Sequence, residues 1–288
     1  MPPTTRPSDP FDDPGLVLSH FTLGRHHDID RRLDAAAAAG CSGIGLWFGQ
    51  HELMEADGTA DALEAMLESR GLCVAEIDTL RLPADGRTPP SADEVAAEHA
   101  AFRLADRHGC RSLHVIGPAV GGVAEVADSF GALCDRAKDH GLMVGLEFMP
   151  TTAVESAADA LAVVEAADRD NGGICIDAWH HFRGADDIDM IRALPGERIV
   201  DVQVSDGPAK PTVADYGEDT RSNRLPPGDG GFDLAGFVAA IRSTGTSAPW
   251  AIEVCTDTDW EGSDAPDATA FVQRCAHGLR QLLVAEEG

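Results

Sequence analysis

Four polar residues interrupt apolar stretches of the chain near the point where each stretch ends. They are Glu147 in GLEFMP, Asp177 in GGICIDAW, Gln203 in IVDVQVSD and Glu253 in WAIEVC. Any one of them alone is more simply a capped or salt-bridged strand end, because a buried carboxylate is costly unless it is paired or bound to a metal. Together, three carboxylates and an amide form an oxygen-rich, negatively charged donor set. This set predicts one divalent cation, Mn²⁺ or Mg²⁺ by preference, with Co²⁺ or Zn²⁺ as alternatives.

Two histidines and a tryptophan stand where they could face the same site. His180 follows Asp177 by three residues, so that it would lie over a site to which Asp177 contributes. His20, near the end of the run LVLSHF, could contact a substrate, although a packed histidine fits equally well. Trp47 ends another apolar run and could form a wall of the pocket, with an aromatic core position as the alternative. We therefore expect all three beside a substrate.

Recurring strands and helices would bring these side chains together. Eight short apolar runs cover residues 16–21, 42–48, 72–78, 112–117, 142–148, 173–179, 199–206 and 250–255. Segments with apolar residues at helical spacing lie between them, and Ser91 with Glu94 forms a capping-box pattern. This alternation predicts an α/β fold, a single (β/α)8 TIM barrel with eight parallel strands. A doubly wound open sheet is the alternative, but no G-x-G-x-x-G follows the first run.

The spacing of the four polar residues fits such a barrel. The intervals are 30, 26 and 50 residues. The first two match one strand-helix unit each, and the third adds a loop over 207–231 that is rich in Pro, Gly and Asp and is expected to be structureless and functional. Strands five to eight are neighbours in a barrel, so their ends meet at its mouth. We predict a catalytic barrel over 15–288 after a flexible, proline-rich tail, 1–14.

Charge and composition restrict the partners. The net charge of −27 repels phosphate backbones, so nucleic acid is not an expected partner. No apolar run reaches 18 residues and the first residues lack a signal-peptide pattern, so we expect no membrane association. The seven cysteines are odd in number and form no C-x-x-C pair, which is typical of reduced cysteines in a cytoplasmic protein.

Taken together, these residues resemble the pattern of the xylose isomerase-like TIM-barrel superfamily, which includes sugar phosphate isomerases and epimerases. The resemblance covers about residues 15–285 and lies in the motifs LEFMP, IDAWHHFRG, VQVSDGP, RLPPGDGGFDL and AIEV. It implies that Glu147, Asp177, Gln203 and Glu253 bind the metal. It also implies that Glu147 and Glu253 act as the acid/base pair.

The same resemblance assigns substrate contacts and shows two departures. It implies that His180 and Arg224, which opens RLPPGDG, contact the substrate. Many members carry histidine where this chain has Gln203, and the glutamine is similar to the hydroxypyruvate isomerase subgroup. Trp47 stands near the end of the second strand, where a glutamate is often found. We therefore expect the substrate pocket to differ from that of the usual epimerases.

The resemblance implies a metal-dependent isomerase or epimerase of a small sugar or hydroxy-keto substrate. The reaction would remove a proton next to a carbonyl and pass through a metal-stabilised enediolate. The alternative is a metal-dependent dehydratase of a polyhydroxy ketone, of the inosose or dehydroshikimate type. A nuclease is disfavoured by the charge and the few histidines at the mouth, and a non-catalytic sugar-binding barrel would need no acid/base pair. The expected partner is a small carbohydrate-like molecule, and a homo-oligomer is compatible with the sequence.

Other polar residues have ordinary structural explanations. His114 lies in the middle of an apolar run and is expected in the core. Glu76 and Asp78 are two apart on one strand and share a face, with Asp78 closer to the mouth. Arg183 and Lys210 could hold an anionic substrate group, but pairing with surface carboxylates is the default expectation.

Overall fold

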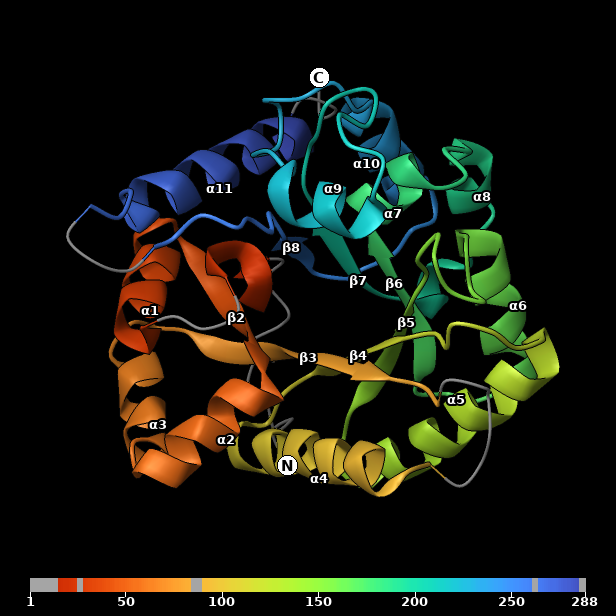
Figure 1. Ribbon diagram of the computed structural model, residues 1–288, viewed down its shortest axis with the longest axis horizontal. Coiled ribbons are helices and arrows are strands. Elements are labelled where there is room, and N and C mark those ends of the chain that lie inside the picture. Colours follow the sequence, from red (N-terminus) through yellow and green to blue (C-terminus); the bar gives the residue numbers. More distant parts are fainter. Residues whose placement is uncertain (1–14, 25–27, 84–89, 261–263, 285–288) are drawn as a thin grey trace, which may run out of the picture.

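The computed structural model describes residues 15–24, 28–83, 90–260 and 264–284. In this part of the chain, parallel strands form one closed barrel in chain order, with helices around its outside (Figure 1). The strands are β1 (Leu16–Leu18), β2 (Cys41–Trp47), β3 (Cys73–Arg81), β4 (Ser112–Ile116), β5 (Met143–Glu147), β6 (Gly172–Asp177), β7 (Ile199–Val204) and β8 (Trp250–Ile252). The predicted (β/α)8 barrel is confirmed. The predicted tail, 1–14, lies outside the described residues.

Helices follow the strands and cover the barrel. They are α1 (Ile29–Ala38), α2 (Phe48–Asp57), α3 (Ala60–Glu68), α4 (Ala92–His108), α5 (Val123–Lys138), α6 (Ala157–Ala167), α7 (Ala178–Arg183), α8 (Ile188–Arg192), α9 (Tyr216–Ser222), α10 (Leu234–Ser243) and α11 (Ala268–Val284), with 3-10 turns η1 (His20–Leu23) and η2 (Gly196–Arg198). Apolar side chains of strands and helices pack into one large core. Within the described residues, no helix is both long and apolar enough to cross a membrane.

Local sequence signals explain where several helices begin and end. Ser91 and Glu94 form the predicted capping box at the start of α4. Gly109 ends that helix in the left-handed region, with φ of 65°. A residue with a side chain is strained in this conformation, so glycine suits the turn into β4.

Two expectations about the strands and loops were wrong in detail. The segment 207–231 is not structureless, because it contains α9 and a pair of backbone hydrogen bonds between Asp206 and Leu225, both 2.8 Å. The first strand ends at Leu18, so the end of the apolar run continues as η1 rather than as strand. In both places, side-chain hydrogen bonds to neighbouring elements hold backbone that has no apolar periodicity.

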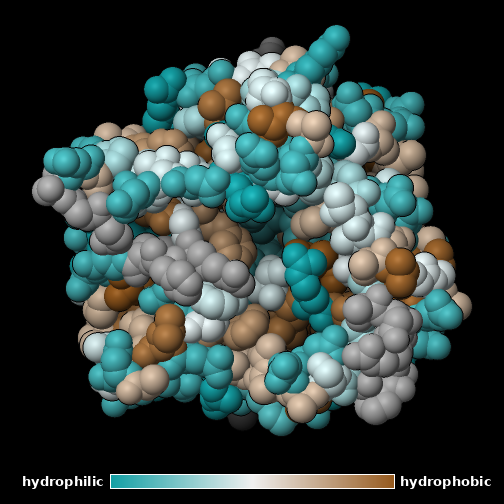
Figure 2. Space-filling model, in the orientation of Figure 1, coloured by the Kyte–Doolittle hydropathy of each residue, from teal (hydrophilic) through white to brown (hydrophobic). Residues whose placement is uncertain are grey.

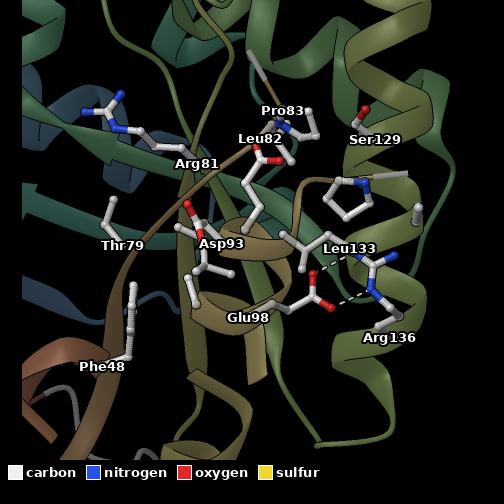
Figure 3. A pocket seen from close by; sticks show the side chains of 15 residues that line it. Phe48, Thr79, Arg81, Leu82, Pro83, Asp93, Glu98, Ser129, Leu133 and Arg136 are labelled. Carbon is white, nitrogen blue, oxygen red and sulfur yellow. Dashed lines mark hydrogen bonds and ion pairs between the residues drawn. The ribbon is translucent and has the colours of Figure 1, made fainter. Parts of the chain in front are cut away.

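A cavity of about 260 Å³ lies on the flank of the barrel, between the end of β3, α4 and α5 (Figure 3). Glu98 and Arg136 close part of its wall with two hydrogen bonds of 2.6 and 2.7 Å. The Arg81 side chain extends away from Leu133 and Arg136 in this view. Arg81 also lines the cavity at the barrel mouth, so it stands between the two.

Candidate functional site

The mouth of the barrel contains a cavity of about 390 Å³ at the carboxyl ends of the strands. The face of the molecule that carries α9 is hollowed near its centre (Figure 2). Six of the residues that the sequence predicts for the site line this cavity: Trp47, Glu147, His180, Gln203, Arg224 and Glu253. Active sites of TIM barrels lie at this end of the strands, because the loops there are free to vary.

The strand ends place the four predicted metal ligands at the same end of the barrel. Glu147 and Asp177 are the last residues of β5 and β6, Gln203 is next to last in β7, and Glu253 follows β8 directly. Asp177 pairs in register with Gln203 across the sheet. All four are buried. Their assignment as ligands stays a prediction.

Glu147, Asp177 and His180 form the tightest group of these side chains. Each offers a ligand atom, and the atoms lie within 4.8 Å of one another. His180 Nε2 is 3.2 Å from Glu147 Oε1 and 3.4 Å from Asp177 Oδ2. The other oxygen of Asp177 accepts a hydrogen bond of 2.8 Å from the backbone N–H of Trp179, which caps α7. Because α7 starts directly after Asp177, the D-x-x-H spacing places His180 one helical turn later, beside the aspartate.

Arg224 balances part of this negative charge. Its Nη1 is 2.8 Å from Asp177 Oδ2 and donates to the backbone carbonyl of Glu253 at 3.0 Å. The carboxylate of Glu253 accepts a hydrogen bond of 2.9 Å from Ser19. Burial raises the pKa of the Glu253 carboxyl well above its ordinary value, and the charge of Asp177 adds to the rise. This carboxyl therefore takes up a proton more readily than one in water.

Gln203 contacts a polar network inside the barrel rather than the Glu147 group. Its Oε1 accepts from Cys175 Sγ at 3.4 Å, and its Nε2 lies 3.4 Å from His114 Nδ1. Gln203 also lines the mouth cavity, so this residue lies between the interior network and the mouth.

His114 crosses the barrel interior between carboxylates. Its Nδ1 is 3.0 Å from Asp78 Oδ1 on β3, and its Nε2 is 2.9 Å from Asp201 Oδ2 on β7. The predicted core position of His114 is confirmed, but its surroundings are polar. Glu76 lies 3.9 Å from the same Nε2, and burial raises the pKa of the Glu76 carboxyl well above its ordinary value.

This interior network is a second set of side chains with ligand geometry. Glu76, His114 and Asp201 also place one atom each within 4.8 Å. None of the three lines the mouth cavity, whereas Glu147 and His180 do. A substrate at the mouth can therefore reach the Glu147 group and not the interior one.

Helix α9 covers the mouth and contacts α7 through side chains. Trp179 Nε1–H donates to Thr220 at 3.0 Å, and Arg183 donates to Asp219 at 2.7 Å. The Arg183 guanidinium also lies 4.5 Å from the ring centre of Trp179. Arg183 pairs with a carboxylate, as expected. The pair is buried rather than on the surface, because the side chains of Arg183 and Asp219 are 3% and 2% exposed. Lys210 is exposed.

The ends of the long β7–β8 connection are fastened to Asp206. One oxygen of its carboxylate accepts from the backbone N–H groups of Gly207 and Phe232, and the other from those of Gly228 and Gly230, at 2.8 to 3.1 Å. A Cβ at Gly230 would lie 2.3 Å from Asp206 Oδ1, so only glycine permits this approach. We call this arrangement the Asp206 clasp. It holds the backbone near Arg224 in place.

The structure adds cavity residues that the sequence analysis missed. Arg81 at the end of β3 and Arg221 in α9 are exposed and line the mouth cavity. Neither forms an ion pair with a carboxylate among the described residues. Nothing in periodicity or motif distinguishes these arginines from surface charges, so only the fold could place them here.

His20 and Trp47 lie side by side, with ring centres 6.3 Å apart. Trp47 lines the cavity, as predicted for a wall. His20 is fully buried and is not among the residues that line the cavity, so its contact with substrate stays a prediction.

Comparison with known proteins identifies related chains. The family model of the xylose isomerase-like TIM barrel matches residues 33–275. A 3-dehydroshikimate dehydratase of Pseudomonas aeruginosa is 30% identical over 277 residues, which cover 94% of this chain and 42% of that protein. An inosose isomerase of Bacillus subtilis is 27% identical over 129 residues, covering 44% of this chain and 45% of that protein.

A solved structure described as IOLI protein with a bound zinc atom has a TM-score of 0.80 at 18% identity, covering 94% of this chain and 98% of that one. At this identity the likeness is one of fold. The chain spans less than half the length of the dehydratase that it matches.

Proposed function

Because the chain belongs to the xylose isomerase-like TIM barrel family, we propose that its barrel removes water from a cyclic hydroxy-ketone that carries a carboxylate, as 3-dehydroshikimate does. The leading sequence-based expectation was an isomerase or epimerase, with this dehydratase as the alternative. Similarity to a 3-dehydroshikimate dehydratase over 94% of the chain favours the alternative.

The observation that carries the proposal is the pair of unpaired arginines at the mouth. Arg81 and Arg221 line the cavity, and no carboxylate in the described part of the chain neutralises either of them. A guanidinium binds a carboxylate through paired, charge-assisted hydrogen bonds. An anionic substrate would supply the missing partner, whereas a neutral sugar would not.

The side chains at the mouth also fit a divalent ion. Glu147, Asp177 and His180 place donor atoms within 4.8 Å of one another beside the cavity, and Gln203 and Glu253 line it. Carboxylate and amide oxygens suit Mn²⁺ or Mg²⁺, with Co²⁺ or Zn²⁺ as alternatives. We propose Glu147, Asp177, Gln203 and Glu253 as the ligands. A bound ion would polarise the substrate carbonyl and acidify the adjacent C–H bond.

In this proposal, Glu147 and Glu253 carry out the two proton transfers. Glu147 ends β5 and Glu253 follows β8, with β6 and β7 between them, so they approach a substrate from different sides. One carboxylate removes the proton from the carbon next to the carbonyl. The other donates a proton to the hydroxyl on the neighbouring carbon, which leaves as water while the electron pair forms a C=C bond. His180 and Arg224 hold substrate oxygens in place.

Isomerisation of a neutral inosose is the second candidate, because the first half of the reaction is the same and one relative is an inosose isomerase. In that case the proton returns to a carbon atom and no water leaves. The two unpaired arginines would then have no substrate partner.

Ultraviolet absorbance distinguishes the two reactions. The purified chain with Mn²⁺ should convert 3-dehydroshikimate into a conjugated, aromatic product, and an inosose should give no such signal. Replacing Arg221 or Arg81 with methionine should lower kcat/KM for the acid about 3- to 10-fold, as expected for a partly exposed charge-assisted hydrogen bond. The methyl ester, which lacks the charge, should be turned over equally by all variants. Equal losses for acid and ester would overturn the assignment of an anionic substrate.

A further inference from the structure

Asp78 lies in the wall of the mouth cavity, but the proposed reaction does not use it. It belongs to β3 and pairs in register with Trp47 of β2, which also lines the cavity. Only 1% of the residue is exposed. A buried carboxylate is costly unless hydrogen bonds or opposite charges satisfy it, so the partners of Asp78 indicate its role.

The protein satisfies part of this carboxylate. Oδ1 lies 3.0 Å from Nδ1 of His114, and Oδ2 accepts a hydrogen bond of 3.4 Å from the backbone N–H of His20. Within the described ranges of the chain, no arginine or lysine forms an ion pair with Asp78. A carboxylate has about four lone-pair positions for donors. Asp78 therefore keeps the capacity to accept a hydrogen bond from a ligand in the cavity.

The backbone at Asp78 departs from regular strand pairing. The register between β3 and β4 shifts between Ile77 and Leu80. In a regular strand, Asp78 and Arg81 would point to opposite faces, because they are three residues apart. Both nevertheless line the mouth cavity, together with Thr79. Such irregularities are common beside active sites, where they redirect side chains.

Asp78 faces the predicted metal ligands from the other half of the barrel. The strands follow chain order around the barrel, so β3 stands opposite β7, whereas the ligands come from β5 to β8. A substrate that reaches the ligands would therefore have Asp78 on its other side. Arg81 and Arg221 line the same cavity and carry the opposite charge. A hydroxy acid can satisfy both charges only with its carboxylate at the arginines and a hydroxyl at Asp78, because like charges repel.

We propose that Asp78 is a specificity-determining residue, which accepts a hydrogen bond from a substrate hydroxyl and thereby fixes the direction in which a hydroxy acid lies in the cavity. The direction rests on the proposed function, because the arginines must bind the carboxylate. Recognition of the hydroxyl does not, since an inosose also offers hydroxyl groups. A site built to bind a hydroxyl rejects an analogue without it, because the buried acceptor is then left unpaired.

Binding of two aromatic acids tests this contact without turnover. 3,4-Dihydroxybenzoate is the aromatic acid expected from the dehydration, and benzoate lacks its hydroxyls. Calorimetric titration of the Mn²⁺-loaded protein should give a Kd at least about 10-fold lower for the dihydroxy acid, as expected for a hydrogen bond to a charged group. 3,4-Dimethoxybenzoate keeps the oxygens but cannot donate, so it should bind no better than benzoate.

Replacement of Asp78 with asparagine removes the charge at nearly constant size. The ratio of the two Kd values should fall about fivefold in Asp78→Asn, because a neutral acceptor forms a hydrogen bond of about half the strength. Asp201→Asn is the matched control, since Asp201 contacts the other nitrogen of His114 at 2.9 Å and is not among the residues that line the cavity. In this control the ratio should stay within twofold of the original.

The outcomes separate this proposal from the proposed function. An unchanged ratio in Asp78→Asn, or an equal fall in both asparagine variants, would overturn the proposal, because Asp78 would then only hold His114. If Asp78→Asn does not fold, tight binding of the dimethoxy acid to the original protein overturns it instead. A ratio near one together with turnover of 3-dehydroshikimate would leave the proposed function in place. The expected ratios without turnover would reject the proposed function and keep the contact with Asp78, and failure of both acids to bind would overturn both.

Discussion

Replacement of Gln203 with leucine tests whether this side chain binds metal or only fills the barrel. Gln203 is 2% exposed, and its amide makes two side-chain contacts, with Cys175 and with His114. His114 keeps its shorter hydrogen bonds to Asp78 and Asp201 without it. Leucine has a similar volume, so the metal-free protein should lose at most ~1 kcal/mol of stability.

The expected effect on metal binding is much larger. Loss of a residue that only supports a ligand typically weakens metal affinity 10- to 100-fold, so loss of a ligand should reach at least the upper end, about 100-fold in Kd. That factor corresponds to about 2.7 kcal/mol. The effect on binding therefore exceeds the effect on stability, and the two can be separated in one variant.

Calorimetric titration with MnCl₂ measures the affinity, and urea unfolding in the presence of a chelator measures the stability of the metal-free protein. Gln273→Leu is the matched control, because this glutamine lies on the outside of α11 and donates to the backbone of Ala38. Gln203→His should restore binding and shift the preference towards Zn²⁺ or Co²⁺. A Gln203→Leu protein that binds Mn²⁺ within threefold of the original affinity would refute the ligand assignment.

Three further predictions address the chemistry, pH dependence and packing. Glu253→Gln should retain bound metal but lose at least about 100-fold of the enzyme-dependent deuterium exchange next to the carbonyl in D₂O, because an amide cannot act as a base; exchange at the original rate would make Glu253 a ligand only. His51 and His108 pack edge to face at 5.7 Å, and burial lowers the pKa of both, that of His108 to about 4. The unfolded chain therefore binds these protons first, and the free energy of unfolding should fall by ~1–2 kcal/mol as the pH drops from 6.5 towards 4, after allowance for partial exposure; urea titrations that show the same loss in His108→Gln would contradict this cause. A Cβ at Gly173 would lie 2.5 Å from the Arg198 carbonyl oxygen, so Gly173→Ala should cost about 1–3 kcal/mol in thermal unfolding, and an unchanged melting temperature would show that η2 can move.

The barrel could be predicted because its signals are local and repeated. Short apolar runs mark the strands, and the capping box at Ser91 marks a helix start that the structure confirms. The residues at strand ends could be predicted for the same reason, since a charge at the end of a buried run has few structural explanations. Position along a strand was thus enough to gather Glu147, Asp177, Gln203 and Glu253 at one end.

Contacts between distant segments could not be predicted in this way. Tyr216 and Arg221 lie in α9, whose seven residues show no apolar stripe because the helix is held by hydrogen bonds and ion pairs to α7. His114 was expected among apolar side chains, and its polar partners come from β3 and β7. A single sequence gives no signal for such pairs, since each residue alone resembles a surface charge or a core position.

Because of the Asp206 clasp, the position of Arg224 does not depend on which residues form the loop before it. Four backbone N–H groups on both sides of the connection meet one carboxylate, so the chain is closed at its base whatever lies between. Lengthening a closed loop is inexpensive, about 0.6 kcal/mol for each doubling. Residues 208–215 can therefore be replaced without moving Arg224, whereas the side chains of α9 that contact α7 must be kept. A designer could thus change the rim of the mouth while the strand ends below it stay as they are.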